Sequence, residues 1–153
     1  NYYANIQNAG SSYISNDFWY VNPVNLCVYA EGYINEPCTL ELAIPDNFQI
    51  ACGLKKEDTK TLSAKDYYEL VDSPLMASAT LQHRTYQLQT TTFYVWMQGN
   101  IKPDWQQILI DFEKFTASQI AAMGSFPESE YHFLNLIFIF INFDIISIID
   151  SSL

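Results

Sequence analysis

Turn signals divide the first hundred residues into short runs rich in β-branched, aromatic and alternating apolar residues. Residues 38–44 alternate most clearly, with Leu40, Leu42 and Ile44 on one face of the predicted strand. The same signals predict strands at residues 24–31, 48–52, 80–89 and 91–98, and an edge strand with a turn within residues 2–20. Short strands separated by turns favour an antiparallel β-sandwich, with the charged stretch 55–60 as a solvated loop.

A helical period replaces the strand pattern after Gly99. Pro103 and Asp104 are typical of a helix start, because proline lacks the donor that a first turn leaves unpaired and an acid favours the positive end of the helix dipole. Gly124 is a typical stop, and a strand is predicted to begin at Tyr131. The apolar side chains that follow a 3.6-residue period between these signals are Trp105, Ile108, Leu109, Phe112, Phe115, Ile120 and Met123.

We therefore predict a mainly β fold that is α+β overall, with a domain boundary near residues 99–103. Residues 1–100 are expected to form the β-sandwich domain. Residues 101–153 are expected to hold the amphipathic helix and the first strand of a second, incomplete domain. Within the first domain a short helix is predicted at residues 64–71, with Ser63 as its N-cap and Pro74 as the signal that ends it.

Composition limits the partners of the chain. Seventeen Asp and Glu against seven Lys and Arg give a formal net charge of −10, which repels phosphate backbones, so we predict no nucleic-acid partner. The hydrophobic content of 49% predicts a folded core. Cys27, Cys38 and Cys52 lie in apolar runs without CxxC spacing. We predict that they are buried free thiols, which favours a reducing compartment such as the cytoplasm.

The final segment, residues 136–149, is almost entirely Ile, Phe and Leu. About fourteen apolar residues are too few for a bilayer, which needs roughly twenty, and Asp144 argues further against a membrane helix. No signal peptide is visible after Asn1, which leaves localisation open. Burying a large apolar side chain is worth about 1.5–3 kcal/mol. We therefore expect the strand at Tyr131 to continue into this segment, and a homodimer to complete its burial.

The titratable residues show no pattern typical of an active site. Zinc hydrolases need converging ligands, most often an HExxH pair on a helix, whereas His83 and His132 are distant single histidines. The three cysteines lack zinc-site spacing, and no GxSxG elbow or Gly-rich phosphate loop is present. We predict no catalytic residue, no metal ligand and no cofactor in this chain.

Several strings, in order along the chain, resemble the amino-terminal region of the glycyl aminopeptidase family. They are EPCTLELAIP at residues 36–45, DNFQIACGL at 46–54, YYELVDSP at 67–74, and GNIKPDW at 99–105 followed by YHFL at 131–134. That family is peptidase family sixty-one, which belongs to the gluzincins of clan MA. The resemblance implies a bacterial zinc aminopeptidase with a β-rich amino domain, a thermolysin-like catalytic domain and often a PDZ domain.

The resemblance also implies what to expect of function. After YHFL the family continues to G-x-E-H and HExxH motifs, and this sequence instead runs into its apolar segment. We therefore expect a chain truncated before the zinc-binding motif, as by a frameshift or a shortened gene. Such a chain should bind no zinc and be inactive alone, with peptide substrate held only in an intact enzyme.

Asp72, on the turn before Pro74, is the one residue with a predicted ligand role. In related gluzincin aminopeptidases the amino domain lends polar groups to the amino end of the substrate, so an acid on a rigid turn is a candidate substrate-binding residue. The alternative is that Asp72 only caps its turn. For the whole chain, the alternatives are a free-standing β-sandwich binding module without a peptidase role, and a structural protein that dimerises through its apolar segment.

Overall fold

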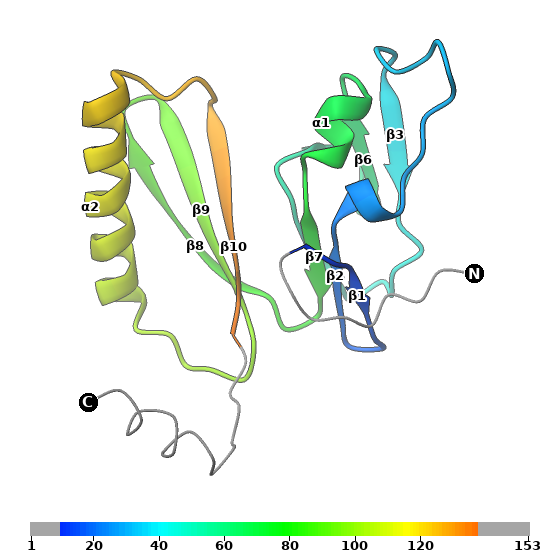
Figure 1. Ribbon diagram of the computed structural model, residues 1–153. Coiled ribbons are helices and arrows are strands. Elements are labelled where there is room, and N and C mark those ends of the chain that lie inside the picture. The colour runs from blue at the N-terminus through cyan, green and yellow to red at the C-terminus, as the bar shows by residue number, and fades with distance from the viewer. Residues whose placement is uncertain (1–9, 138–153) are drawn as a thin grey trace, which may run out of the picture.

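The computed structural model describes residues 10–137, which form three small sheets and two α-helices (Figure 1). The central sheet has the strand order β1-β2-β7-β4, the outer sheet β3-β6-β5, and the third sheet β10-β9-β8. The strands are β1 (Tyr13–Ile14), β2 (Phe18–Val21), β3 (Cys38–Glu41), β4 (Gln49–Ala51), β5 (Lys55–Lys56), β6 (Thr61–Ala64), β7 (Leu75–Ser78), β8 (Gln82–Leu88), β9 (Thr91–Gln98) and β10 (Glu130–Leu136). The helices are the 3₁₀-helix η1 (Pro23–Asn25), α1 (Tyr67–Val71) and α2 (Trp105–Met123).

The central and outer sheets pack face to face as a sandwich. Its core is built from Ile50 and Leu75 of the central sheet, Leu62 of the outer sheet and Leu70 of α1, each at most 7% exposed. Side chains on alternate positions of a strand point to one face. Leu75 therefore faces this core, while the next residue, Met76, faces the opposite side of the central sheet.

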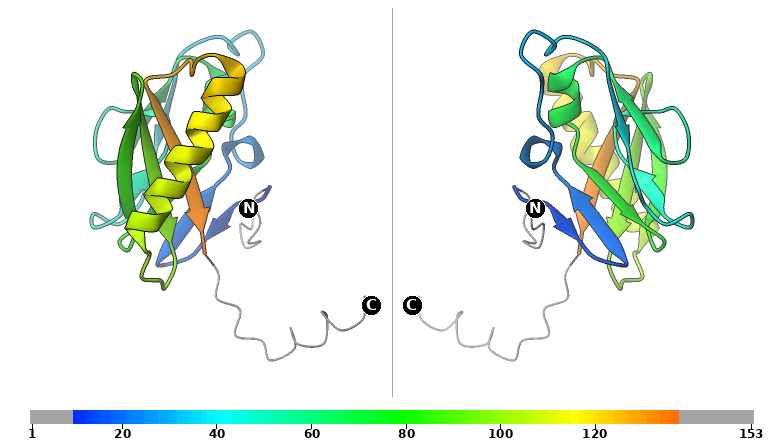
Figure 2. Two further views of the ribbon diagram at one scale, coloured as in Figure 1. Left: turned by 90° about the vertical axis from the view of Figure 1, so that its left-hand side faces the viewer. Right: turned by 90° about the vertical axis from the view of Figure 1, so that its right-hand side faces the viewer.

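The third sheet covers that opposite side. Met76 packs there with Trp96 of β9 in a second core. On the far face of the third sheet, Phe133 of β10 meets Phe112 of α2 edge-on at 4.9 Å between ring centroids. The hydroxyl groups of Tyr86 and Thr116 are 2.6 Å apart. The layers therefore follow one another as α2, third sheet, central sheet and outer sheet (Figures 1 and 2).

The predicted fold class is confirmed: the described chain is mostly antiparallel strands, followed by one long helix and a strand. The helix runs from Trp105 to Met123 as its sequence period predicts. Asp104 caps its start, where its carboxylate accepts a hydrogen bond from the Gln107 amide at 3.2 Å. Gly124 caps its end with a φ of +93°. One pairing is parallel, since β10 returns beside β9 after the helix.

The strand predicted at residues 24–31 is wrong. Pro23 starts a 3₁₀ turn, in which the amides of Leu26 and Cys27 both donate to the Pro23 carbonyl at 3.0 and 2.8 Å. Residues 26–37 then run as an irregular segment. The loop predicted at residues 55–60 begins instead with a short edge strand, β5, paired with β6.

The start of the short helix also differs from the prediction. Its N-cap is Asp66, not Ser63, because the Asp66 carboxylate accepts from the Glu69 amide at 2.8 Å. Ser63 lies in β6, opposite Thr39.

The predicted domain boundary near residues 99–103 falls between β9 and α2, and β9 pairs along its length with β10 beyond that point. The dimer predicted through residues 136–149 concerns a segment almost wholly outside the described residues, and no helix of the described part is long and apolar enough to cross a membrane.

Candidate functional site

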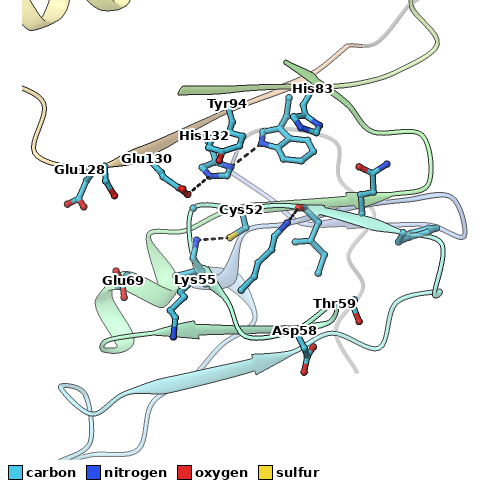
Figure 3. Close-up of a pocket in the computed structure, with 18 residues that line it drawn as sticks. Cys52, Lys55, Asp58, Thr59, Glu69, His83, Tyr94, Glu128, Glu130 and His132 are labelled. Atoms are coloured by element: carbon cyan, nitrogen blue, oxygen red, sulfur yellow. Dashed lines mark hydrogen bonds and ion pairs between the residues drawn. The ribbon is translucent and has the colours of Figure 1, made fainter. Parts of the chain in front are cut away.

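A cleft of about 990 Å³ lies between the β4–β5 segment and the face of the third sheet that looks away from α2. A second cavity of about 530 Å³ adjoins it at the turn between α1 and β7. The two share Gly53, Glu69, Glu128, Glu130 and His132. Figure 3 shows that Glu69, Glu128 and Glu130 gather at one end of the larger cleft, with His83 at the other. The cleft is therefore acidic at one end and aromatic at the other.

The aromatic wall is made by neighbouring side chains of the third sheet. His83 of β8 stacks on Trp96 of β9 at 4.1 Å between ring centroids. Tyr94 of β9 stacks on His132 of β10 at 4.4 Å. Successive strands bring these rings together because His83 is paired with Trp96, and His132 with Tyr94, in the sheet register. The two pairs adjoin one another, since Tyr94 and Trp96 are stacked at 6.5 Å between ring centroids.

His132 is the most constrained polar group of the cleft. Its Nδ1 accepts a hydrogen bond from Trp96 Nε1–H at 3.0 Å. Its Nε2 lies 3.9 Å from a carboxylate oxygen of Glu130, and its side chain is only 11% exposed. Burial, together with the nearby positive groups Lys56 and His83, lowers the pKa of His132, and Glu130 opposes the shift. The imidazole is therefore held in its neutral form at neutral pH.

Asp72, the residue predicted from the sequence, lines the smaller cavity that adjoins the acidic end of the cleft. Asp72 is the C-cap of α1, and its amide donates to the Tyr68 carbonyl at 3.0 Å. Its exposed carboxylate lines the smaller cavity together with Glu128 and Glu130. Glu69 is already engaged, since its carboxylate accepts from the Lys65 amide. Three carboxylates from two different layers therefore line one cavity.

Two further groups of the cleft have pKa values that burial changes. Lys56 donates to the Ile50 carbonyl at 2.7 Å, and burial lowers its pKa. Burial raises the pKa of the Cys52 thiol to about 11. All three cysteines are free, but only Cys52 is buried, and Cys27 and Cys38 are half-buried. The prediction of three buried thiols is therefore correct for Cys52 alone.

The described residues do not fit zinc. Within residues 10–137 no three His, Cys, Asp or Glu side chains are grouped to hold a metal ion. Of the two histidines, His132 already uses Nδ1 as the acceptor for Trp96, and His83 stacks on the same indole. Zinc sites need at least three converging protein ligands.

Comparison with known families places the first two sheets. The family model of the peptidase M61 N-terminal domain matches residues 1–79, just over half of the chain. The chain belongs to this family. The resemblance noted in the sequence is thereby confirmed for the N-terminal domain of these peptidases. The matched part ends directly after β7, so the central and outer sheets make up the M61 domain, and the third sheet and α2 follow it.

A solved structure shares the fold of the M61 chain beyond that domain. The crystal structure of an aminopeptidase N family protein from Idiomarina loihiensis aligns with 83% of this chain at a TM-score of 0.75 and 23% sequence identity. The M61 chain spans 23% of the length of that protein. At this identity the likeness shows the fold alone. No curated protein matches the chain.

The site of the M61 chain contains both predicted and unpredicted residues. Asp72 was predicted from the family resemblance and its position on a turn, and it lines the smaller cavity. His132 and Trp96 carried no sequence signal, because their contact joins residues of two strands separated by a helix. Only the parallel return of β10 beside β9 brings them together. Predicting that pairing would have been the one way to find the site.

Proposed function

We propose that this M61 chain is the non-catalytic amino-terminal part of a bacterial zinc aminopeptidase, a hydrolase, and that its cleft holds the amino end of a peptide. One observation carries the proposal. Asp72 of the M61 domain and Glu128 and Glu130 of the following unit line a single cavity of about 530 Å³. Carboxylates that converge from two layers suit a protonated amino group, which offers three donors.

The shape of the neighbouring cleft supports a peptide rather than a simple cation. The acidic cavity opens into the larger cleft through five shared residues, so a ligand held by its amine has space in which to continue. The wall of that cleft is aromatic, with Tyr94 and His132 stacked at 4.4 Å. Apolar walls with few polar groups are typical of small-molecule and peptide sites.

The test is a titration of the purified chain with glycyl-leucinamide, followed by two-dimensional NMR. We expect weak saturable binding, loss of binding for the N-acetylated peptide, and recovery of the peptide uncleaved. Asp72→Asn should weaken binding about tenfold, by roughly 1.4 kcal/mol, because a charge-assisted hydrogen bond to the amine is lost. Equal binding of the free and acetylated peptides would contradict the proposal.

A matched control separates site from surface charge. Glu41→Gln removes one carboxylate from the outer sheet, away from both cavities, and should leave peptide binding unchanged. If both variants bind equally well and Asp72→Asn only lowers thermal stability, Asp72 is a capping residue and nothing more. In an intact relative, Ala at the matching position should lower kcat/KM by more than tenfold.

The second candidate is a β-sandwich binding module without a peptidase role, and a different surface favours it. A groove of about 440 Å³ lies beside the irregular segment after η1. Val28, Tyr29 and Tyr33 on its border are 91%, 54% and 66% exposed. Exposed apolar clusters of this kind mark interaction surfaces. If glycyl-leucinamide perturbs these residues instead of Asp72, the module is the better description.

A further inference from the structure

We propose that His132 is a ligand-binding residue that presents Nε2–H to the carbonyl oxygen of the first residue of a bound peptide, while Glu130 accepts from its amino group. The inference rests on the proposed function, because it concerns the same cleft. It adds a specific donor and acceptor that recognise the free amino terminus and the first carbonyl together.

The position of the His132 proton follows from its partner. The indole Nε1–H of Trp96 is a donor only, so Nδ1 of His132 must be the acceptor in their 3.0 Å hydrogen bond. In the neutral ring the proton then sits on Nε2. Stacking on Tyr94 at 4.4 Å holds the plane of the ring, and the hydrogen bond from Trp96 sets which nitrogen faces the indole. Trp96 is in this sense a positioning residue for the donor.

The donor and its neighbouring acceptor face open space. His132 and Glu130 line both cavities, and the Glu130 side chain is 60% exposed. His132 Nε2 and Glu130 Oε2 are 3.9 Å apart, which is longer than a hydrogen bond. In one amino-acid residue the amino nitrogen and the carbonyl oxygen are about 3 Å apart, from standard backbone dimensions. One residue can therefore engage both groups at once.

The charges around His132 make its donor role sensitive to pH. The groups that influence it are Glu130 on β10, Lys56 on β5 and His83 on β8, with Tyr94 of β9 stacked on the ring. Burial, Lys56 and His83 lower its pKa, whereas Glu130 raises it. Protonation would place a hydrogen on Nδ1 and break the bond from Trp96. Peptide binding should therefore weaken once the pH falls below the pKa of His132.

The experiment reads the tautomer directly by long-range ¹H–¹⁵N NMR of the imidazoles in the full chain. In the free protein we expect an unprotonated Nδ1 and a protonated Nε2 for His132. Adding glycyl-leucinamide should shift the Nε2 resonance, and adding N-acetyl-glycyl-leucinamide should not. Trp96→Phe should produce a mixture of tautomers and weaken binding about fivefold. Trp105→Phe, the matched control at the start of α2, should change neither the tautomer nor the binding.

A second pair of variants guards against misfolding of Trp96→Phe. His132→Phe keeps a ring against Tyr94 but removes the donor, and should weaken binding about tenfold. His132→Gln keeps an N–H donor and should recover part of that loss. An Nδ1–H tautomer in the free wild-type protein overturns the inference. The inference is also overturned if the Nε2 resonance does not shift when peptide binds and binding still depends on Asp72. In that case the proposed function stands. If no peptide binds at all, both ideas fall.

Discussion

Cys52 is the residue that burial changes most clearly in its chemistry. Its side chain is 1% exposed, and burial raises its thiol pKa to about 11. Because the thiolate is the reactive form, a thiol with this pKa is almost fully protonated at pH 8. Cys27 and Cys38 are half-buried and therefore within reach of a reagent.

We predict that iodoacetamide at pH 8 modifies Cys27 and Cys38 of the folded chain at least tenfold faster than Cys52. Mass spectrometry of peptides cut after glutamate measures the three rates over time, because Glu31 and Glu41 place the three cysteines in separate fragments. The control is the chain in urea, where all three thiols should react at similar rates. Fast modification of Cys52 without denaturant would show that the packing around β4 opens readily.

For single residues, the sequence predicted a place in the site only where the signal comes from residues next to it in the chain. Asp72 could be singled out because the family resemblance implied a polar group from this domain, and a turn with a following proline is a local signal. The role of His132 depends on two contacts, with Trp96 and with Glu130, and the contact with Trp96 is made across strands. Single histidines at distant positions gave no reason to expect that they would share one cleft.

Among the elements, α2 could be predicted almost to the residue and β7 could not. The helix has one buried face, a capping acid and a terminal glycine, and each of these signals lies in the sequence of the helix itself or next to it. All four residues of β7 are buried, because it lies between the outer sheet on one side and the third sheet on the other. A strand covered on both faces shows no alternation, so its pattern, LMAS, carried no signal.

The end of α2 provides a test at the scale of one element. Gly124 has a φ of +93°, and an added Cβ would meet no atom within 4 Å. Any cost of Gly124→Ala is therefore a backbone cost, which we expect to be about 1–2 kcal/mol of unfolding free energy. Urea denaturation followed by circular dichroism measures it.

Gly53→Ala is the matched control for that test. It also has open space around an added Cβ, and its φ is not positive. We expect this variant to change the unfolding free energy by less than about 0.5 kcal/mol. Equal losses in the two variants would mean that the geometry at Gly124 is not what ends the helix.

For the molecule as a whole, the histidines make stability depend on pH. Burial lowers the pKa of both His83 and His132 in the folded chain. Above about pH 7 both rings are neutral in either state, and they favour neither. As the pH falls through about 6.5, the histidines of the unfolded chain become protonated before those of the folded chain. The free energy of unfolding therefore falls. The lowered pKa values of Asp46, Glu57 and Asp58 act in the same direction at lower pH.

We therefore predict a smaller free energy of unfolding at pH 5.5 than at pH 8. Urea titrations at both values measure the difference. The effect of His132→Gln should be to reduce this pH dependence, because one of the two groups is removed, whereas Glu41→Gln should leave it intact. A chain that is equally stable at both pH values would show that neither imidazole is kept neutral by the fold.

The boundary between domains is also a property of the whole chain. The M61 match ends at residue 79, and β8 of the third sheet begins at Gln82. We propose that the boundary lies in this short connection, because the third sheet continues unbroken from β8 to β10. The change of sequence period after Gly99 marks the start of α2, which is a change of element. Periodicity reports elements, whereas a domain is defined by which elements share a sheet.

The parallel pairing of β10 with β9 fixes an order of events while the protein is being made. Residue 92 pairs with residue 130, and α2 lies between them. The β8–β9 hairpin leaves the ribosome first, with Phe93 and Val95, fully buried in the finished fold, still lacking most of their cover. Non-local pairings of this kind form late. The growing chain therefore passes through a stage in which the apolar edge of the hairpin is unpaired until about forty more residues have been made. Chaperones can bind the exposed edge at this stage.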